Sequence, residues 1–239
     1  MKFLLYGIIR QTPAPDDLLL LNGVENKPVV VIGRQDLFVV CSEVTTAAHA
    51  PDVTMLKEYG MVIEALYKKD TIIPMRYGCL FDNSEQIHLH LTENKKRYTT
   101  LLEELEGCVE MGIRFIPVKE TEPAKDAPSH CKPTEPCTGK DYLMMKRKSY
   151  EQQTRMSEAN RDLINRCNSS LAGYYKKCKN DTPDPAGLSL TDSPSLLSLY
   201  FLTPKSLLEG FIGAFRVFSE KEPVRSLLSG PWPPYNFAI

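Results

Sequence analysis

The sequence predicts an α+β protein built from two units. Its 239 residues are enough for two domains. The expected elements follow the order strand, strand pair, three helices, strand, long helix, strand, helix, strand, whereas a parallel doubly wound sheet would alternate strands with helices. We therefore expect an N-terminal α+β domain over residues 1–107 and a C-terminal domain over residues 108–239. The second domain approaches a ferredoxin-like plan with a helical insertion at about residues 140–180.

The first predicted elements are strands. Lys2–Ile9 is a nearly continuous apolar run, which is typical of a central strand covered on both faces. Pro28–Ile32 and Leu37–Val44 are rich in β-branched residues, and the four residues between them have the length and composition of a hairpin connection. The sequence therefore predicts an antiparallel pair after the first strand.

Helices follow in the first half. Asp52 is a suitable N-cap for a helix that ends near Lys69, because apolar residues recur at helical spacing between them. Thr71–Phe81 contains proline and glycine and is predicted to be irregular and extended. Gln86–Leu91 fits either a strand, by its alternation, or a short helix, by its polar start; we favour the helix.

Around residue 107 the hydrophobic period changes. Tyr98–Leu105 has a clear helical stripe, and Gly107 is placed to be the residue that follows the helix C-cap. Val109–Phe115 then alternates apolar with polar or small residues, which predicts a half-buried strand.

Two polar stretches separate the remaining elements. Residues 119–140 contain four prolines and almost no apolar residue, which indicates a flexible connection without core. Residues 141–179 lack proline and have a narrow apolar stripe that ends at Cys178, so one or more helices are expected. Residues 180–193 are predicted to form a second loop.

The last third is predicted to be strand, helix and strand. Ser195–Leu202 is the first of these strands. Thr203 followed by Pro204 has the pattern of an N-cap with proline at the first helical position, and the helix behind it carries a phenylalanine-rich face. Val224–Leu228 is expected to form a last short strand before the C-terminal tail.

The tail combines stiffness with apolar side chains. Each of its three prolines fixes φ and lacks an N–H, so we expect residues 230–239 to be extended and to lie outside helices and sheets. Burial of a large apolar side chain is worth roughly 1.5–3 kcal/mol. We therefore expect Trp232, Tyr235, Phe237 and Ile239 to dock the tail on the protein's own body. The alternative is an exposed proline-rich ligand for the aromatic groove of a partner.

Composition narrows the function classes. A net charge of −1 and a pI of about 6.4 lack the basic excess of nucleic-acid-binding proteins. No window approaches eighteen consecutive apolar residues, so we expect no membrane span and a cytoplasmic compartment. The seven cysteines are an odd number in a chain large enough to have a proper core, which predicts free and mostly buried thiols.

Familiar patterns for catalysis and metal binding are absent. The sequence has no phosphate-binding glycine loop, no G-x-G-x-x-G after a strand and no G-x-S-x-G. His88 and His90, and His130 with Cys131 and Cys137, lack the paired spacing of a zinc site. We therefore expect no catalytic, cofactor-binding or metal-binding residue.

Two sets of polar or aromatic residues suggest other roles. Tyr200 and Phe201 lie on a predicted strand where RNA-binding domains place stacking aromatics, but core packing is the simpler explanation. Arg76 lies in an apolar stretch, where its guanidinium would fix the local conformation by pairing with Glu64, Glu110 or another buried acid. The alternative is a ferredoxin-like module or enzyme that holds a small anion in a cleft around Arg76.

Three segments together resemble the gas vesicle protein F/L family. They resemble that family's "LP-x-R-F-G", "L-x-G-x-V-E-x-G" and closing "GPWPPY-x-F" segments. The residues that carry the resemblance are Pro74, Arg76, Tyr77, Gly78, Gly107, Glu110, Gly230, Pro231, Trp232, Pro233, Pro234 and Tyr235. The segments fall in the family's order and bracket nearly the whole chain. Tyr77 replaces the usual phenylalanine, and residues 119–139 match no part of the family's pattern.

The resemblance implies an accessory or minor structural protein of gas vesicles, the hollow protein-walled buoyancy organelles of prokaryotes. It implies two α+β domains, contacts with the small hydrophobic shell protein and with other gas vesicle accessory proteins, and localisation at the gas vesicle. It implies no enzymatic activity, no cofactor, and neither nucleic acid nor membrane as a partner. A mean hydropathy of −0.27 agrees with an accessory role, since a wall that excludes liquid water from a gas face must be more apolar.

Overall fold

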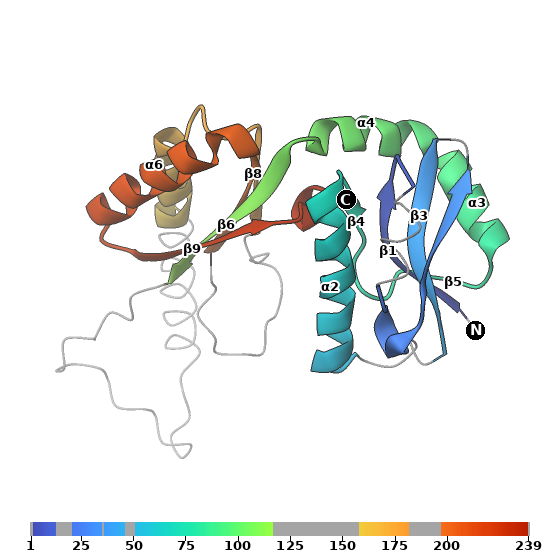
Figure 1. The fold of residues 1–239 in the computed structure, drawn as a ribbon. Coiled ribbons are helices and arrows are strands. Elements are labelled where there is room, and N and C mark those ends of the chain that lie inside the picture. Colours follow the sequence, from blue (N-terminus) through green and yellow to red (C-terminus); the bar gives the residue numbers. More distant parts are fainter. Residues whose placement is uncertain are drawn as a thin grey trace, which may run out of the picture.

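The protein is built on two antiparallel sheets, each with helices packed against it (Figure 1). The computed structural model describes residues 2–12, 21–34, 36–45, 51–116, 158–181 and 197–238. The predicted α+β class with two units is confirmed. The first sheet precedes Gly107 and the second follows it, and we propose the domain boundary there. The predicted linker at 119–140 lies outside the described residues.

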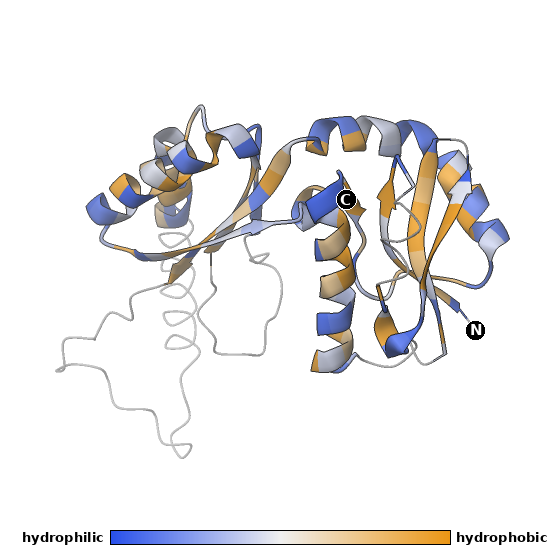
Figure 2. Ribbon diagram, in the orientation of Figure 1, coloured by the Kyte–Doolittle hydropathy of each residue, from blue (hydrophilic) through white to orange (hydrophobic). Residues whose placement is uncertain are grey.

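The first sheet has the strand order β2-β3-β1-β4, and β5 also pairs with β1. Its strands are β1 (Lys2–Ile9), β2 (Val29–Arg34), β3 (Leu37–Val44), β4 (Ile73–Pro74) and β5 (Leu80–Phe81). The predicted hairpin is confirmed, with β2 and β3 antiparallel. In Figure 2 the strands of this sheet are mostly hydrophobic, whereas α2 and α4 alternate between hydrophobic and hydrophilic residues. That contrast is expected when a sheet is buried and its helices are half-exposed.

Helices cover both faces of the first sheet. They are α2 (Val53–Lys69), α3 (Ser84–Glu93) and α4 (Lys95–Leu105), and the short 3-10 turn η1 (Val24–Asn26) lies before β2. Apolar residues of α2 pack with one set of strand side chains, and those of α3 and α4 pack with the other. From Leu4 to Ile9 every residue of β1 is buried, as predicted for a central strand.

The predicted helix ends of the first unit are also confirmed. The Asp52 carboxylate accepts a hydrogen bond of 2.8 Å from the Met55 N–H, so Asp52 is the N-cap of α2. The ambiguous segment around Gln86 is the helix α3. Gly107 follows the C-cap of α4 with φ +66°, a conformation that a residue with a side chain adopts only under strain.

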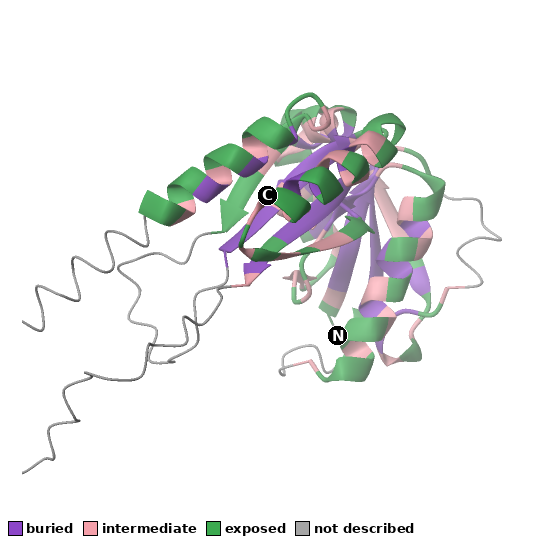
Figure 3. Ribbon diagram, turned by 90° about the vertical axis from the view of Figure 1, so that its left-hand side faces the viewer, coloured by how far each residue is buried: buried purple, intermediate pink, exposed green. Residues whose placement is uncertain are grey.

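The second sheet has the order β7-β8-β6-β9. Its strands are β6 (Cys108–Ile116), β7 (Lys177–Asp181), β8 (Leu197–Pro204) and β9 (Arg225–Trp232). Helical residues 158–170 and helix α6 (Leu208–Lys221) share a core cluster with β6 and β8, and α6 is preceded by the 3-10 turn η2 (Lys205–Leu207). Figure 3 shows the buried strands behind helices that each bury one face. The resulting order, strand-helix-strand-strand-helix-strand, agrees with the ferredoxin-like plan, which stays a prediction.

The predicted helical region over 141–179 is wrong at its C-terminal end. Lys177–Asp181 forms the strand β7, which pairs with β8, and Cys178 lies opposite Phe201. Gly173 has φ +89° and falls in the turn between the helical residues 158–170 and this strand. The apolar stripe of the preceding helix extends in sequence to Cys178, so the prediction continued the helix into β7. The short, charged sequence of β7 has no alternating pattern, and it is a strand because it hydrogen-bonds to β8.

Two further predictions at the second sheet are wrong. β6 is buried on both faces from Cys108 to Ile113 rather than half-buried: Glu110 has only 4% of its surface exposed, and Gly112 is buried too, whereas Arg114 is exposed as predicted. Thr203 and Pro204 end β8 instead of opening a helix, and Thr203 is fully buried opposite Val109. In both places the prediction used only neighbouring residues in the sequence, whereas the burial of β6 and the end of β8 depend on elements that pack against these strands.

The predicted core roles of cysteine and aromatic residues hold for the described residues. Cys41, Cys79, Cys108, Cys167 and Cys178 are free thiols. Phe201 is fully buried and contacts Phe211 edge to face. Cys131, Cys137 and His130 lie outside the described residues.

His88 and His90 lie on α3, where the His90 ring contacts Tyr98 at 2.6 Å through Nε2 and the phenol oxygen. In the described ranges no three His, Cys, Asp or Glu side chains are grouped so that they could hold a metal ion. Among the helices of those ranges, none has the length and apolar character needed to cross a membrane.

Candidate protein-binding surface

The C-terminal tail joins the two units. β9 runs as far as Trp232, and the 3-10 turn η3 (Tyr235–Phe237) follows it. Gly230 and Pro231 therefore lie within a strand, contrary to the prediction that the proline-rich end stays outside the sheet. β9 is the last strand of its sheet, and an edge strand tolerates proline because its outward N–H has no ladder partner to lose.

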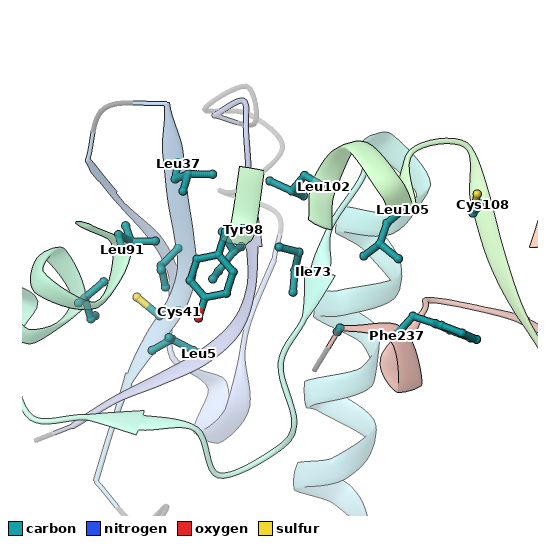
Figure 4. Close-up of a cluster of buried hydrophobic side chains, with 14 of the residues drawn as sticks. Leu5, Leu37, Cys41, Ile73, Leu91, Tyr98, Leu102, Leu105, Cys108 and Phe237 are labelled. Carbon is teal, nitrogen blue, oxygen red and sulfur yellow. The ribbon is translucent and has the colours of Figure 1, made fainter. Parts of the chain in front are cut away.

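The tail docks through its last residues. Phe237 and Ala238 are buried in a cluster with Leu105 and Cys108, and Figure 4 shows Phe237 on the tail close to α2 and Leu105. Tyr235 packs against the cluster that includes the buried face of α2. The predicted packing of the tail between the two units is confirmed for Tyr235 and Phe237, and Ile239 lies outside the described residues. Because Pro233 and Pro234 are buried, they are not displayed as a proline-rich ligand.

Trp232 does not anchor the tail as predicted. Its side chain is 52% exposed, although its backbone pairs with Glu110 in β6. The prediction assumed that a solitary tryptophan in a docked segment must be buried. Phe237 supplies the apolar anchor instead, and Trp232 is left at the surface of an edge strand.

A buried carboxylate fixes the tail to the second sheet. Glu110 accepts two hydrogen bonds from Asn236: one of 2.8 Å from the backbone N–H to Oε2 and one of 2.7 Å from Nδ2 to Oε1. Lys179 donates from Nζ to the Asn236 carbonyl at 2.6 Å and lies 5.6 Å from the Phe237 ring centre. Burial raises the pKa of the Glu110 carboxyl, and both Asn236 donors and Lys179 oppose that shift.

The junction between the units also has direct contacts. The Tyr67 hydroxyl of α2 donates a hydrogen bond of 2.6 Å to the Cys108 carbonyl of β6, and Lys205 lies 5.1 Å from the Tyr67 ring centre. Lys177 of β7 forms an ion pair of 2.5 Å with Glu104 of α4. Burial is the main cause that raises the pKa of Tyr67 to about 12, so its hydroxyl remains a donor at neutral pH.

Removing the Tyr67 hydroxyl tests the junction. We expect Tyr67→Phe to lower the free energy of unfolding by about 1 kcal/mol, because the Cys108 carbonyl loses its side-chain donor. Urea unfolding followed by circular dichroism measures the change. Tyr174→Phe is the control, because the Tyr174 ring packs over Gly210 of α6 in the second unit. Equal losses in the two variants would contradict the role of the hydroxyl.

A cavity of about 190 Å³ lies at this junction. It is lined by the ends of α2 and α4, together with Lys68, Lys69 and Lys205. The last carbonyls of a helix carry partial negative charge and favour cations. The lysines therefore complement two helix C-termini.

The predicted burial of Arg76 is wrong. Its side chain is exposed, Glu64 pairs with Lys68 instead, and Glu110 is bonded to Asn236. Arg76 is not among the residues that line the junction cavity. Its position follows from the turn that carries it, because β4 ends at Pro74 and Arg76 lies between Met75 and Cys79, whose backbones still bond to β1.

The other residues of that segment have structural positions. Pro74 is buried and pairs with Gly7 of β1. Tyr77 is half-buried, and its ring contacts Tyr59 edge to face at 5.2 Å. Gly78 has φ +90°, which explains a glycine at this point of the turn. The structure therefore brings Glu110 together with the tail and leaves the Arg76 segment on the first unit.

The buried cysteine thiols of the described residues are held in their neutral forms. Burial raises the pKa of Cys41 and Cys167 to about 12 and that of Cys178 to about 11. A nucleophilic cysteine needs the opposite shift, toward the thiolate. These thiols are therefore core residues.

Exposed apolar side chains are the remaining feature of the surface. They lie mainly on α2, where Val53, Leu56 and Met61 are exposed, and on β9, where Leu227 and Trp232 are exposed. Sequence reasoning missed β9 as a surface because it assigned Trp232 to the interior. It also missed Asn236, whose only signal was its position next to the apolar tail residues.

The chain matches the family model described as "Gas vesicle synthesis protein GvpL/GvpF" over residues 2–239. The chain belongs to the GvpL/GvpF family. Gas vesicle protein L of Streptomyces sp. (strain CB03234) is 24% identical over 234 residues, which are 91% of this chain and 85% of that protein. Gas vesicle protein F1 of Halobacterium salinarum is 24% identical over 125 residues, or 51% of this chain and 58% of that protein.

Solved GvpF structures have the same fold. The crystal structure of GvpF from Anabaena sp. PCC7120 has a TM-score of 0.76 and 17% sequence identity, covering 100% of this chain and 96% of that one. GvpF from Microcystis aeruginosa has a TM-score of 0.73 and 18% identity, covering 100% and 99%. Membership of the GvpL/GvpF family supports a gas-vesicle-related role and localisation at the gas vesicle.

Proposed function

We propose that this GvpL/GvpF protein is a non-enzymatic accessory or minor structural component that takes part in gas vesicle assembly by contacting the hydrophobic shell protein. The match of nearly the whole chain to the family supports this proposal most strongly. The structure supports adhesion rather than turnover in the described residues, because their buried thiols are protonated. Contacts with other gas vesicle accessory proteins belong to the same proposal.

In this role the two units act as one body. The motif residues around Gly107, Glu110 and the tail hold the second sheet against the first unit, and the Arg76 segment closes the first sheet. A rigid body of this kind presents its exposed strands and helices in fixed positions. Such preorganisation lowers the entropy cost of binding.

Deletion and fractionation test the proposal. Deleting the gene is expected to reduce or abolish gas vesicles, and expression of the full chain from a plasmid is expected to restore them. The chain is also expected to co-purify with isolated vesicles. Retention after a detergent or urea wash would indicate a built-in component, and loss would indicate a transient assembly factor.

Normal vesicles in the deletion strain, together with no association between the purified chain and the shell protein, would refute the proposal. Electron microscopy of vesicle number and shape separates a failure to assemble from a change in stability of finished vesicles.

A further inference from the structure

β9 is an edge strand with an unused side. It pairs with β6 on one side, and no other strand of the described residues pairs with it. Backbone N–H and C=O groups along such an edge need partners, either water or another strand. The unpaired side of β9 from Arg225 to Ser229 therefore has the geometry to accept one more extended segment, whereas Pro231 has no N–H to offer at the end of the strand.

The two edges of this sheet differ in charge. Of the five residues of β7, Lys177, Lys179 and Asp181 are charged, which is how edges are protected against pairing. Of the eight residues of β9, only Arg225 is charged, and it is the first residue of the strand. An uncharged partner strand therefore matches the β9 edge, because its addition would bury no unpaired charge along the rest of the strand.

Apolar side chains flank the same edge. Leu227 is 55% exposed and Trp232 is 52% exposed, near opposite ends of β9. The strand runs toward α2 (Figure 1), and the Asn236–Glu110 hydrogen bonds just beyond Trp232 fix its end. A strand added to this edge could pack its apolar side chains against Leu227 and Trp232.

We propose that the outer edge of β9 binds an extended, uncharged apolar segment of a gas vesicle shell subunit, which adds a fifth strand to the second sheet. This inference rests on the proposed function and identifies the surface that performs it. Leu227 and Trp232 contact apolar side chains of the segment, and the backbone of β9 provides the hydrogen bonds.

Charged substitutions on the edge test the proposal. The double variant Leu227→Lys/Trp232→Lys is compared with Val217→Lys, which adds a lysine to a 52% exposed apolar site on α6 in the same unit. Each full-length chain is co-expressed with the cognate shell protein, and the retained shell protein is quantified after affinity purification. We expect the double variant to retain about tenfold less shell protein than the wild type and Val217→Lys to retain about as much as the wild type.

Hydrogen exchange identifies the mode of binding. With shell protein bound, the backbone amides of residues 225–229 are expected to exchange more slowly, while those of β7 are unchanged. Thermal unfolding of all variants is measured alongside. If the double variant has a much lower melting temperature than the wild type, Leu227→Lys alone is compared with Val217→Lys, and the same reduction in binding is expected.

The outcomes separate this inference from the proposed function. If the wild type and the double variant bind the shell protein equally, the edge assignment is wrong and the proposed function stands. If no chain binds the shell protein, the proposed function itself fails. If the wild type is a dimer in solution and the double variant a monomer, β9 pairs with a second copy, and the shell segment is the wrong occupant.

Discussion

Gly230→Ala is expected to destabilise the protein by about 3 kcal/mol or more. Gly230 has φ +115°, where residues with a side chain are strained. An added Cβ would also lie 2.7 Å from the Glu110 carbonyl oxygen and 3.0 Å from the Met111 sulfur. The Glu110 carbonyl belongs to the backbone of the central strand β6 and has little freedom to move. The cost of the strained φ angle and the cost of the steric clash therefore add to each other.

Gly213→Ala is the matched control. Gly213 lies in α6, and nothing would lie within 4 Å of its added Cβ. Alanine has the higher helix propensity, so this variant is expected to gain about 0.5–1 kcal/mol. Urea unfolding monitored by far-ultraviolet circular dichroism measures both. A loss below about 1 kcal/mol for Gly230→Ala would mean that the backbone of β9 relaxes readily at this residue, which would contradict a fixed tail.

Local patterns were sufficient for the first unit. The N-cap at Asp52, the β2–β3 hairpin and Gly107 after α4 each depend on residues close together in the chain. The spacing of apolar residues and the presence of capping residues indicate such local secondary structure directly. The predicted helices and the strands β1, β2 and β3 therefore match the observed ones there, including the ambiguous α3. The short strands β4 and β5 lie in a segment predicted to be irregular, and they are strands through their pairing with β1.

Long-range pairing was not predictable in the same way. β7 is a strand only because β8 lies beside it, and its charged sequence has no alternation to reveal it. Thr203 has the composition of an N-cap, but its place opposite Val109 in the sheet decides its role. Tertiary contacts override a local preference of a fraction of a kcal/mol at such positions.

The candidate surface shows the same limit. Trp232 is the only tryptophan, and its size suggested burial; the sequence does not reveal that its strand is an edge. Glu110 was a candidate partner for Arg76, whereas the fold places it beside Asn236, 126 residues along the chain. The partner of a buried polar group is decided by how whole helices and strands pack together, and a single sequence does not indicate that packing.

Asn236→Ala is expected to cost about 2–3 kcal/mol of unfolding free energy at neutral pH. Glu110 is 4% exposed, and the substitution removes the 2.7 Å hydrogen bond to its Oε1. A buried carboxylate oxygen left without that donor bears its desolvation cost, which is larger for a charged group than for a neutral one. Asn165→Ala on the exposed side of helical residues 158–170 is the control, expected to change stability by less than about 0.5 kcal/mol.

The cost of Asn236→Ala should also depend on pH. Burial already raises the pKa of Glu110 in the folded protein, and the Asn236 donors limit that rise. A carboxyl whose folded pKa is raised contributes its full stability below the unfolded pKa, about 4.3, and loses it as pH rises through the folded pKa. Loss of a donor raises the folded pKa further, so the difference between wild type and Asn236→Ala grows from about pH 4.5 toward neutrality.

Urea unfolding at a series of pH values, read by circular dichroism and by Trp232 fluorescence, measures this growth. Trp232 is the sole tryptophan and precedes the docked turn, so its emission reports the tail while circular dichroism reports the sheets and helices. Glu110→Gln removes the titrating group and is expected to make the cost of Asn236→Ala independent of pH. A pH-dependent cost that persists in the Glu110→Gln background would assign the titration to another residue, and a cost near zero in the wild-type background would show that the tail is held by Phe237 packing without the Glu110–Asn236 pair.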